Sequence, residues 1–159
     1  MNPKDAKQAN PRLVFDTASA FDRAYHILSA TLTDKPYVRA PSPPLYTCAA
    51  LSLELYLKCL LIIEHGSYIE DHDLSKLFNL LRSQTKRALK KRYAKWVKEE
   101  TVFPELLNFT TFEALLEACK LTFTKGRYSF ELNPFSWTLD GLTVATKERI
   151  LRLHPDWAD

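Results

Sequence analysis

Two charged residues interrupt an otherwise apolar stretch of this sequence. Residues 45–63 are nearly all apolar, and Glu54 and Lys58 lie near the middle. On a helix, this spacing places both side chains on one face, with the acid in the favourable N-terminal position. A buried carboxylate needs such a partner or becomes neutral. We expect either a structural ion pair or a polar pocket for a phosphate or a base, which would also contain His72, Arg127, Tyr128 and Glu131.

A run of cations forms the second charged feature. Residues 82–98 contain eight Lys or Arg residues and no acid, and because the whole chain has a net charge of +3, the remainder carries −5. Like charges four residues apart destabilise an isolated helix, so an anionic partner would relieve the repulsion. Nucleic acid is the first candidate for this partner and an acidic protein the second. The alternative is a solvated helix face whose charges are neutralised by acids elsewhere in the fold, such as Glu105, Glu113 and Glu117. The candidate anion-binding residues are Arg82, Lys86, Arg87, Lys90, Lys91 and Lys95.

Several short motifs occur in an order that resembles a known superfamily. They are Ala50-x3-Glu54-Leu55-x-Leu57-Lys58, then His72-Asp73-Leu74, then Leu77-Phe78-x2-Leu81, then Phe123-x3-Arg127-Tyr128-x2-Glu131. Over residues 45–131, this pattern resembles the HEPN superfamily, above all bacterial members of uncharacterised or defence context. The resemblance implies an α-helical bundle, often a homodimer. It also implies a superfamily that contains metal-independent ribonucleases, toxin components and non-catalytic nucleotide-binding proteins.

HEPN nucleases carry an Arg, four to six further residues and then a His in a late helix, and the copies from two protomers meet. Arg149 and His154 have this spacing. The resemblance implies that His154 moves a proton at the ribose 2′-OH and that Arg149 stabilises the phosphorane, without a metal. On one helix these side chains point about 140° apart. Asp156 and Trp157 stand where nuclease members often have a Tyr, and an ordinary helix end is the alternative.

No motif for a metal or a cofactor is present. The sequence lacks zinc-ligand spacing, a Walker A loop and a G-x-G-x-x-G motif, so we expect no cofactor. The acidic residues around His72 could bind a divalent ion, but helix capping is the preferred interpretation. The odd number of cysteines and the absence of an apolar leader predict a cytoplasmic protein with reduced thiols. The charges of Glu54 and Lys58 argue against a membrane span.

Long runs with a 3.6-residue period and only three glycines among 159 residues favour an all-α protein. We expect a flexible tail over residues 1–10 and a single HEPN-like helical domain over residues 11–159. The expected helices cover residues 12–32, 45–64, 74–81 continuing or bending into 82–100, 111–123 and 139–153. They would form an up-and-down bundle of about five helices around the apolar helix at 45–64.

Two details of this arrangement can be tested directly. The apolar stripe expected to face the core from the first helix is Leu13, Ala20, Phe21, Ala24, Ile27, Leu28 and Leu32. Residues 121–132 alternate between apolar and polar, so a β-hairpin there is an alternative to a helix end. The first hypothesis is therefore an RNA- or nucleotide-binding protein, whose catalytic form would be a metal-independent ribonuclease in a toxin or phage-defence setting. The alternative is a non-catalytic protein-interaction module with a structural polar core.

Overall fold

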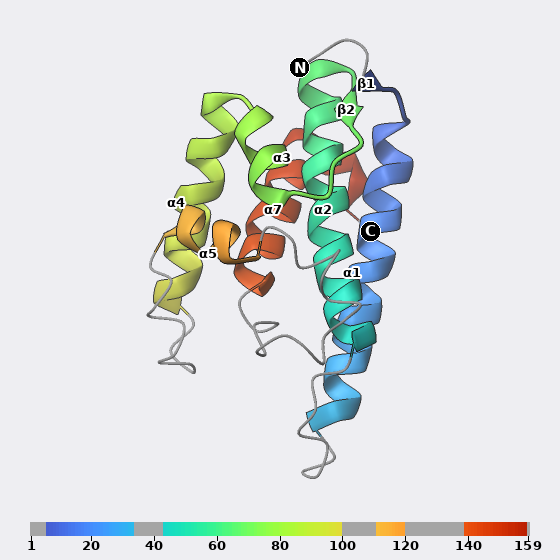
Figure 1. Ribbon diagram of the computed structural model, residues 1–159, viewed down its shortest axis with the longest axis vertical. Coiled ribbons are helices and arrows are strands. Elements are labelled where there is room, and N and C mark those ends of the chain that lie inside the picture. Colours follow the sequence, from blue (N-terminus) through green and yellow to red (C-terminus); the bar gives the residue numbers. More distant parts are fainter. Residues whose placement is uncertain (1–5, 34–42, 100–110, 120–138, 159) are drawn as a thin grey trace.

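The computed structural model describes residues 6–33, 43–99, 111–119 and 139–158, and these residues form a helical bundle (Figure 1). The all-α class predicted from the sequence is confirmed. The described elements are β1 (Ala6–Lys7), α1 (Pro11–Thr33), α2 (Pro43–His65), β2 (Tyr68–Ile69), α3 (Leu74–Leu80), α4 (Ser83–Glu99), α5 (Phe112–Cys119), α7 (Leu139–Leu153) and the 3-10 helix η5 (Pro155–Trp157).

Helix α2 is the centre of the bundle, as its apolar sequence predicts. It packs against α1, α3, α7 and β2, and Leu53, Leu57 and Leu60 on it are fully buried. The helix is long and apolar enough to cross a membrane, but 72% of its most apolar window is buried inside the fold. Burial of this kind is what a core helix of a bundle shows. The helix ends at His65, and the next residue, Gly66, has a φ of 74°, in the left-handed region that favours glycine.

Helices α3 and α4 are separate, whereas the sequence left open whether one helix continues or bends between them. Leu81 adopts an extended backbone and buries its side chain in the core. The next residue, Arg82, donates its backbone N–H to Glu64 Oε2 over 2.7 Å. This bond ties the start of α4 to the end of α2. Asp73 caps α3 by accepting the N–H of Lys76, as the capping interpretation predicts.

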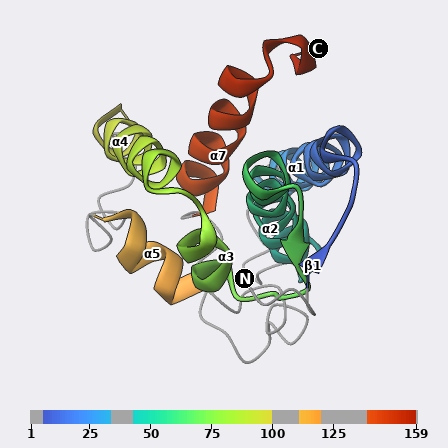
Figure 2. The ribbon, with the colours of Figure 1, turned by 90° about the horizontal axis from the view of Figure 1, so that it is seen from above.

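Helix α7 lies between α4 and the pair formed by α1 and α2 (Figure 2). Its close approach to α4 depends on Gly141. A Cβ atom at this position would lie 2.5 Å from the ring of Trp96. The absence of a side chain at Gly141 therefore allows Trp96 to lie flat against α7.

The N-terminal segment differs from the expected tail in its described part. Ala6 and Lys7 pair antiparallel with Ile69 and Tyr68, and Lys7 forms an ion pair with Glu70. Asn10 caps α1, accepting the N–H of Arg12 at 2.9 Å. Residues 6–10 therefore contact the bundle at both ends, through the strand pair at Ala6 and Lys7 and through the cap at Asn10. The remaining tail residues, 1–5, lie outside the described residues.

The apolar stripe predicted for α1 is wrong at Leu13, Ala20 and Ile27, whereas Leu28 packs against the core and Phe21 and Ala24 are half-buried. Leu13 and Ile27 are 63% and 65% exposed, and Ala20 between them is also exposed. The residues that α1 buries instead are Phe15, Ala18, Ser19, Asp22 and Tyr25. The buried face contains two polar residues, Ser19 and Asp22, so apolar periodicity alone does not identify it. Two predictions lie partly or wholly outside the described residues. They are the candidate hairpin at 121–132 and the last part, residues 120–123, of the helix expected at 111–123.

Candidate functional site

Helix α4 divides its residues between a core face and a charged face. Thr85, Leu89 and Tyr93 are buried, and Trp96 packs against the core beside them. Arg87, Lys91 and Lys98 lie on the opposite side of the helix, about 200° away from Thr85, Leu89 and Trp96 respectively, and are exposed. The helix therefore presents its cations to solvent along one line.

Most cations of α4, and Arg82 immediately before it, have partners. Arg82 donates to the backbone oxygen of Glu64 over 2.6 Å, and Lys86 donates to that of Asn79 over 3.1 Å. Lys90 pairs with Glu113, one of the three acids expected to neutralise these cations. Of the other two, Glu117 accepts a hydrogen bond from Ser75, and Glu105 lies outside the described residues. Lys95 lies 3.4 Å from Glu99 on the same helix. Four of the six predicted anion-binding residues are thus at least partly neutralised or engaged.

Arg92 forms the strongest of these links. Its Nε and Nη2 donate to the two carboxylate oxygens of Glu148 on α7, over 2.7 and 2.8 Å. The hydrogen bond lowers the pKa of Glu148 and raises the pKa of Arg92. A two-bond fork of this kind fixes orientation as well as charge. Arg92 therefore belongs to the α4–α7 contact and is unavailable for a ligand.

Three cations remain without such a link. Arg87, Lys91 and Lys98 form no ion pair with any other residue that the structure describes. They are spaced by four and seven residues, which places them on one face, and Lys95 lies next to them. We call Arg87, Lys91 and Lys98 the cationic stripe. The sequence reasoning had left Lys98 out of the candidate residues, although its spacing from Lys91 signals its place on this face.

The charged pair of α2 is buried, as expected. Glu54 is 1% exposed and Lys58 is 7% exposed, and Lys58 Nζ lies 2.6 Å from Glu54 Oε1. His72 approaches from the loop before α3, with Nδ1 at 3.1 and 3.0 Å from the two carboxylate oxygens of Glu54. The ammonium of Lys58 also lies 5.6 Å from the centre of the Tyr68 ring. Glu54 therefore has two partners that satisfy both of its oxygens.

The structure brings together three of the six residues predicted for the polar pocket, Glu54, Lys58 and His72. Arg127, Tyr128 and Glu131 lie outside the described residues. The acids flanking His72 have structural roles, because Glu70 pairs with Lys7 and Asp71 with Lys76. In the described ranges, no three His, Cys, Asp or Glu side chains are arranged to hold a metal ion.

Arg149 and His154 face different neighbours in one copy of the chain. Arg149 is half-buried and donates from Nη2 to Thr85 Oγ1 on α4 over 3.4 Å. Its Nε is buried and has no hydrogen-bond partner among the described residues. The His154 ring stacks on Trp157, with ring centres 4.1 Å apart, and Trp157 packs on Phe15 of α1. A single copy therefore does not assemble them into one site.

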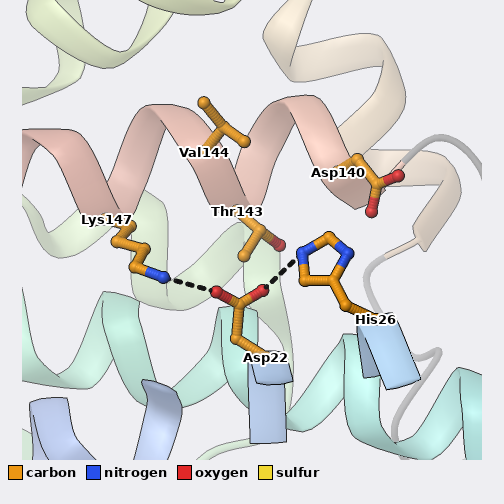
Figure 3. Close-up of a pocket in the computed structure, with 6 residues that line it drawn as sticks. All are labelled: Asp22, His26, Asp140, Thr143, Val144 and Lys147. Carbon is orange, nitrogen blue, oxygen red and sulfur yellow. Dashed lines mark hydrogen bonds and ion pairs between the residues drawn. The ribbon is translucent and has the colours of Figure 1, made fainter. Parts of the chain in front are cut away.

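A polar cluster that the sequence reasoning missed joins α1 to α7 (Figure 3). Asp22 is 5% exposed; its Oδ2 lies 2.7 Å from Lys147 Nζ and its Oδ1 lies 3.5 Å from His26 Nε2. A pocket of about 120 Å³ lies beside it, lined by Asp22, His26, Asp140, Thr143, Val144 and Lys147. Burial, together with the charge of Asp140, raises the pKa of the neighbouring Tyr25 phenol. The spacing of Asp22 from Ala18 and Tyr25 was the available signal, because it is that of a helix core face.

The described residues thus carry three separate charged features. The cationic stripe is open to solvent, while the Glu54–Lys58–His72 cluster and the Asp22–Lys147 pair neutralise themselves inside the bundle. An open, uncompensated set of charges can bind a partner without first breaking an internal contact. In comparisons with known proteins, no protein-family model, no curated protein and no solved structure matches this chain.

Proposed function

We propose that the chain is an RNA-binding helical domain that holds the RNA backbone along the cationic stripe of α4. One observation carries this proposal: Arg87, Lys91 and Lys98 are exposed on one face and form no ion pair within the described residues. From Arg87 to Lys98 the stripe extends about 16 Å, long enough for several phosphates. The choice of RNA over other polyanions comes from the HEPN resemblance.

Phosphate contacts of this kind bind without reading a sequence. Each Lys or Arg that neutralises a phosphate releases a condensed counterion, so the affinity falls as salt rises. No aromatic side chain interrupts the exposed line of the stripe, which favours contacts with the backbone over stacking with bases. An acidic protein partner would use the same charges, and the salt dependence with RNA of different lengths distinguishes the two.

The binding test uses fluorescence anisotropy with labelled single-stranded RNA over a range of salt concentrations. The stripe variant is Arg87→Gln, Lys91→Gln and Lys98→Gln together. We expect it to bind much more weakly and to lower the slope of log K against log salt by about 2, from about 0.7 per lost phosphate contact.

The matched control removes the same number of charges elsewhere, by Lys7→Gln, Lys76→Gln and Arg152→Gln. These three exposed residues lie on β1, α3 and α7 and form surface ion pairs of small energetic value. The control should bind RNA almost as the native chain does. No affinity for RNA at low salt, or equal losses in the two variants, would refute the proposal.

Ribonuclease activity is the further form of this proposal, with Arg149 and His154 as catalytic residues. His154 would take the proton from a ribose 2′-OH while the 2′-oxygen attacks phosphorus, and Arg149 would stabilise the phosphorane. The bond from phosphorus to the 5′-oxygen then breaks, and the 5′-oxygen leaves with a proton from water, which gives a 2′,3′-cyclic phosphate and a free 5′-OH. The stripe faces away from α7, so an RNA strand held on one copy does not cover Arg149 of that copy. Cleavage therefore requires a second copy, in a cytoplasmic toxin or phage-defence setting, whereas binding does not.

The cleavage test incubates labelled RNA with the protein in EDTA. For a ribonuclease we expect fragments with 2′,3′-cyclic phosphate ends, lost in both Arg149→Ala and His154→Ala. Arg152→Ala and His26→Ala are the matched controls, because they remove an exposed Arg one turn from Arg149 and an exposed His on a different helix. Binding without cleavage under these conditions would leave the non-catalytic version of the function. Cleavage that survives both substitutions would remove Arg149 and His154 as catalytic residues.

A further inference from the structure

The outer face of α1 exposes a regular row of apolar residues. Leu13, Ala20 and Ile27 follow one another at intervals of seven, and Leu13 and Ile27 are 63% and 65% exposed. In both views α1 lies at the edge of the bundle (Figures 1 and 2). These residues belong to the stripe that apolar periodicity alone predicts for the core. A seven-residue apolar row is the pattern with which one helix packs along another.

Two opposite charges lie along one flank of this row. Asp16 and Arg23 are both exposed and are also seven residues apart. Viewed along the helix, they lie within about 20° of each other on the same side of Leu13, Ala20 and Ile27. Asp16 pairs with Arg12 of its own helix at 2.9 Å, while Arg23 forms no ion pair with another described residue. The opposite flank, which includes Thr17 and Ala24, has no charge.

The face is complementary to itself in one orientation only. Two antiparallel copies related by a two-fold axis at Ala20 place Leu13 opposite Ile27 of the second copy. The same axis places Asp16 of each copy beside Arg23 of the other, because flanks of the same kind meet in an antiparallel pair. In a parallel pair, each charged flank would meet the uncharged flank of the other copy. Charge complementarity therefore selects the antiparallel arrangement.

We infer that α1 is a docking surface for α1 of a second copy of this chain, packed antiparallel about Ala20. Leu13 and Ile27 supply the apolar contacts, Ala20 and Ala24 allow close approach, and Asp16 and Arg23 set the direction. A single pair of helices buries less surface than a standard protein interface, so the dimer forms at high protein concentration and dissociates on dilution.

This dimer has a consequence for the proposed ribonuclease site. His154 stacks on Trp157, which contacts Phe15 near the beginning of α1. In the antiparallel pair, the beginnings of the two α1 helices lie at opposite ends, about 21 Å apart along the axis from Leu13 to Ile27. The α1 dimer therefore keeps the two copies of His154 apart. Its formation is independent of RNA binding and of cleavage.

The test is a charge exchange followed by sedimentation equilibrium at low salt. Asp16→Arg and Arg23→Asp each replace two attractive contacts by two repulsive ones, so each lowers the association constant about fivefold or more. The double variant restores the attraction and returns the constant to within about twofold of the native value. Lys76→Asp, a charge reversal on α3, is the control and leaves the constant unchanged. A monomer at every concentration, or a dimer that neither single variant weakens, would overturn the inference.

Disulfide trapping gives a second measurement that does not depend on charge. Ala20 lies on the proposed axis, so Ala20→Cys should form a disulfide-linked dimer under mild oxidation. Ile27→Cys alone should not, since its partner position is Leu13, but a mixture of Ile27→Cys and Leu13→Cys should. The native chain is the control, because Cys59 and Cys119 are buried and Cys48 is half-buried. Linkage of Ile27→Cys to itself would indicate a parallel pair and contradict the arrangement.

Discussion

The Glu54–Lys58 pair shows how a charged couple is kept inside an apolar helix. Both side chains are nearly completely buried, and a third group, His72, satisfies the remaining oxygen of Glu54. Burying the two charges costs desolvation energy, which the short contact and the extra hydrogen bond offset. The pair therefore need not stabilise the fold more than apolar residues would. Its loss on one side alone, however, leaves a buried charge.

Lys58→Met should reduce the free energy of unfolding by about 3–5 kcal/mol, because it leaves Glu54 buried with only His72 as a partner. Glu54→Gln together with Lys58→Met should cost less than the sum of the two single changes, by about 1–3 kcal/mol. Urea denaturation followed by circular dichroism measures both. Asp71→Asn with Lys76→Met, on a partly exposed ion pair, is the control and should show a coupling below about 1 kcal/mol. A Lys58→Met protein as stable as the native one would mean that this charge is not held as described.

Gly141 determines how closely α4 and α7 pack. In an exposed helix, Gly→Ala is stabilising by about 1 kcal/mol. Here, the added Cβ would enter the ring of Trp96, which also stacks on Tyr93 with ring centres 6.2 Å apart. The need for glycine at position 141 of α7 therefore comes from Trp96 on α4, and the sequence around Gly141 alone does not reveal it.

Gly141→Ala should lower the free energy of unfolding by about 1–3 kcal/mol through overpacking. In a Trp96→Leu background, the same change should become neutral or stabilising, because the ring is no longer there and the helix propensity of alanine is left. Thermal unfolding of the four proteins gives the comparison. A loss of the same size in both backgrounds would show that Gly141 is needed for a reason other than its contact with Trp96.

The positions of the helices could be predicted from the sequence because their signals are local. Asn10 and Pro11 start α1, Gly66 follows α2, and the last helix has the bounds expected for it, residues 139–153. The break between α3 and α4 was harder, since it depends on the bond from Arg82 to Glu64 on another helix. Local patterns specify where a helix is, and distant contacts specify how it ends.

The face that each helix buries could be predicted only where apolar residues alone mark it. This held for α2, but not for α1, whose core face carries Asp22 neutralised by Lys147 from a position 125 residues away. The residues next to Asp22 in the sequence do not indicate that Lys147 is its partner. The same limit applies to α4, where the sequence shows eight cations but not which of them have acids opposite. Only the folded arrangement separates the engaged cations from the stripe.

Charge is distributed unevenly over the chain. Residues 82–98 carry eight positive charges, and the remainder has a net charge of −5 although the total is +3. The acids Glu113, Glu148 and Glu99 neutralise the flanks of α4 but do not reach the line of Arg87, Lys91 and Lys98. A fold selected for stability alone would place acids there, since like charges four residues apart on a helix repel each other. The stripe thus has an energetic cost that an anionic ligand would remove.

The stripe variant, Arg87→Gln with Lys91→Gln and Lys98→Gln, should therefore be more stable than the native chain without RNA, even though it binds RNA more weakly. At low salt the gain should be about 0.5–1 kcal/mol, because the variant relieves repulsion between Arg87, Lys91 and Lys95. At 1 M salt, where the Debye length is about 3 Å, the gain should nearly vanish. Urea denaturation at the two salt concentrations measures it, with Lys7→Gln, Lys76→Gln and Arg152→Gln as the control that loses surface ion pairs instead. A stripe variant less stable than the native chain would mean that these cations have acidic partners within the fold, and it would remove the reason to expect an anionic ligand on α4.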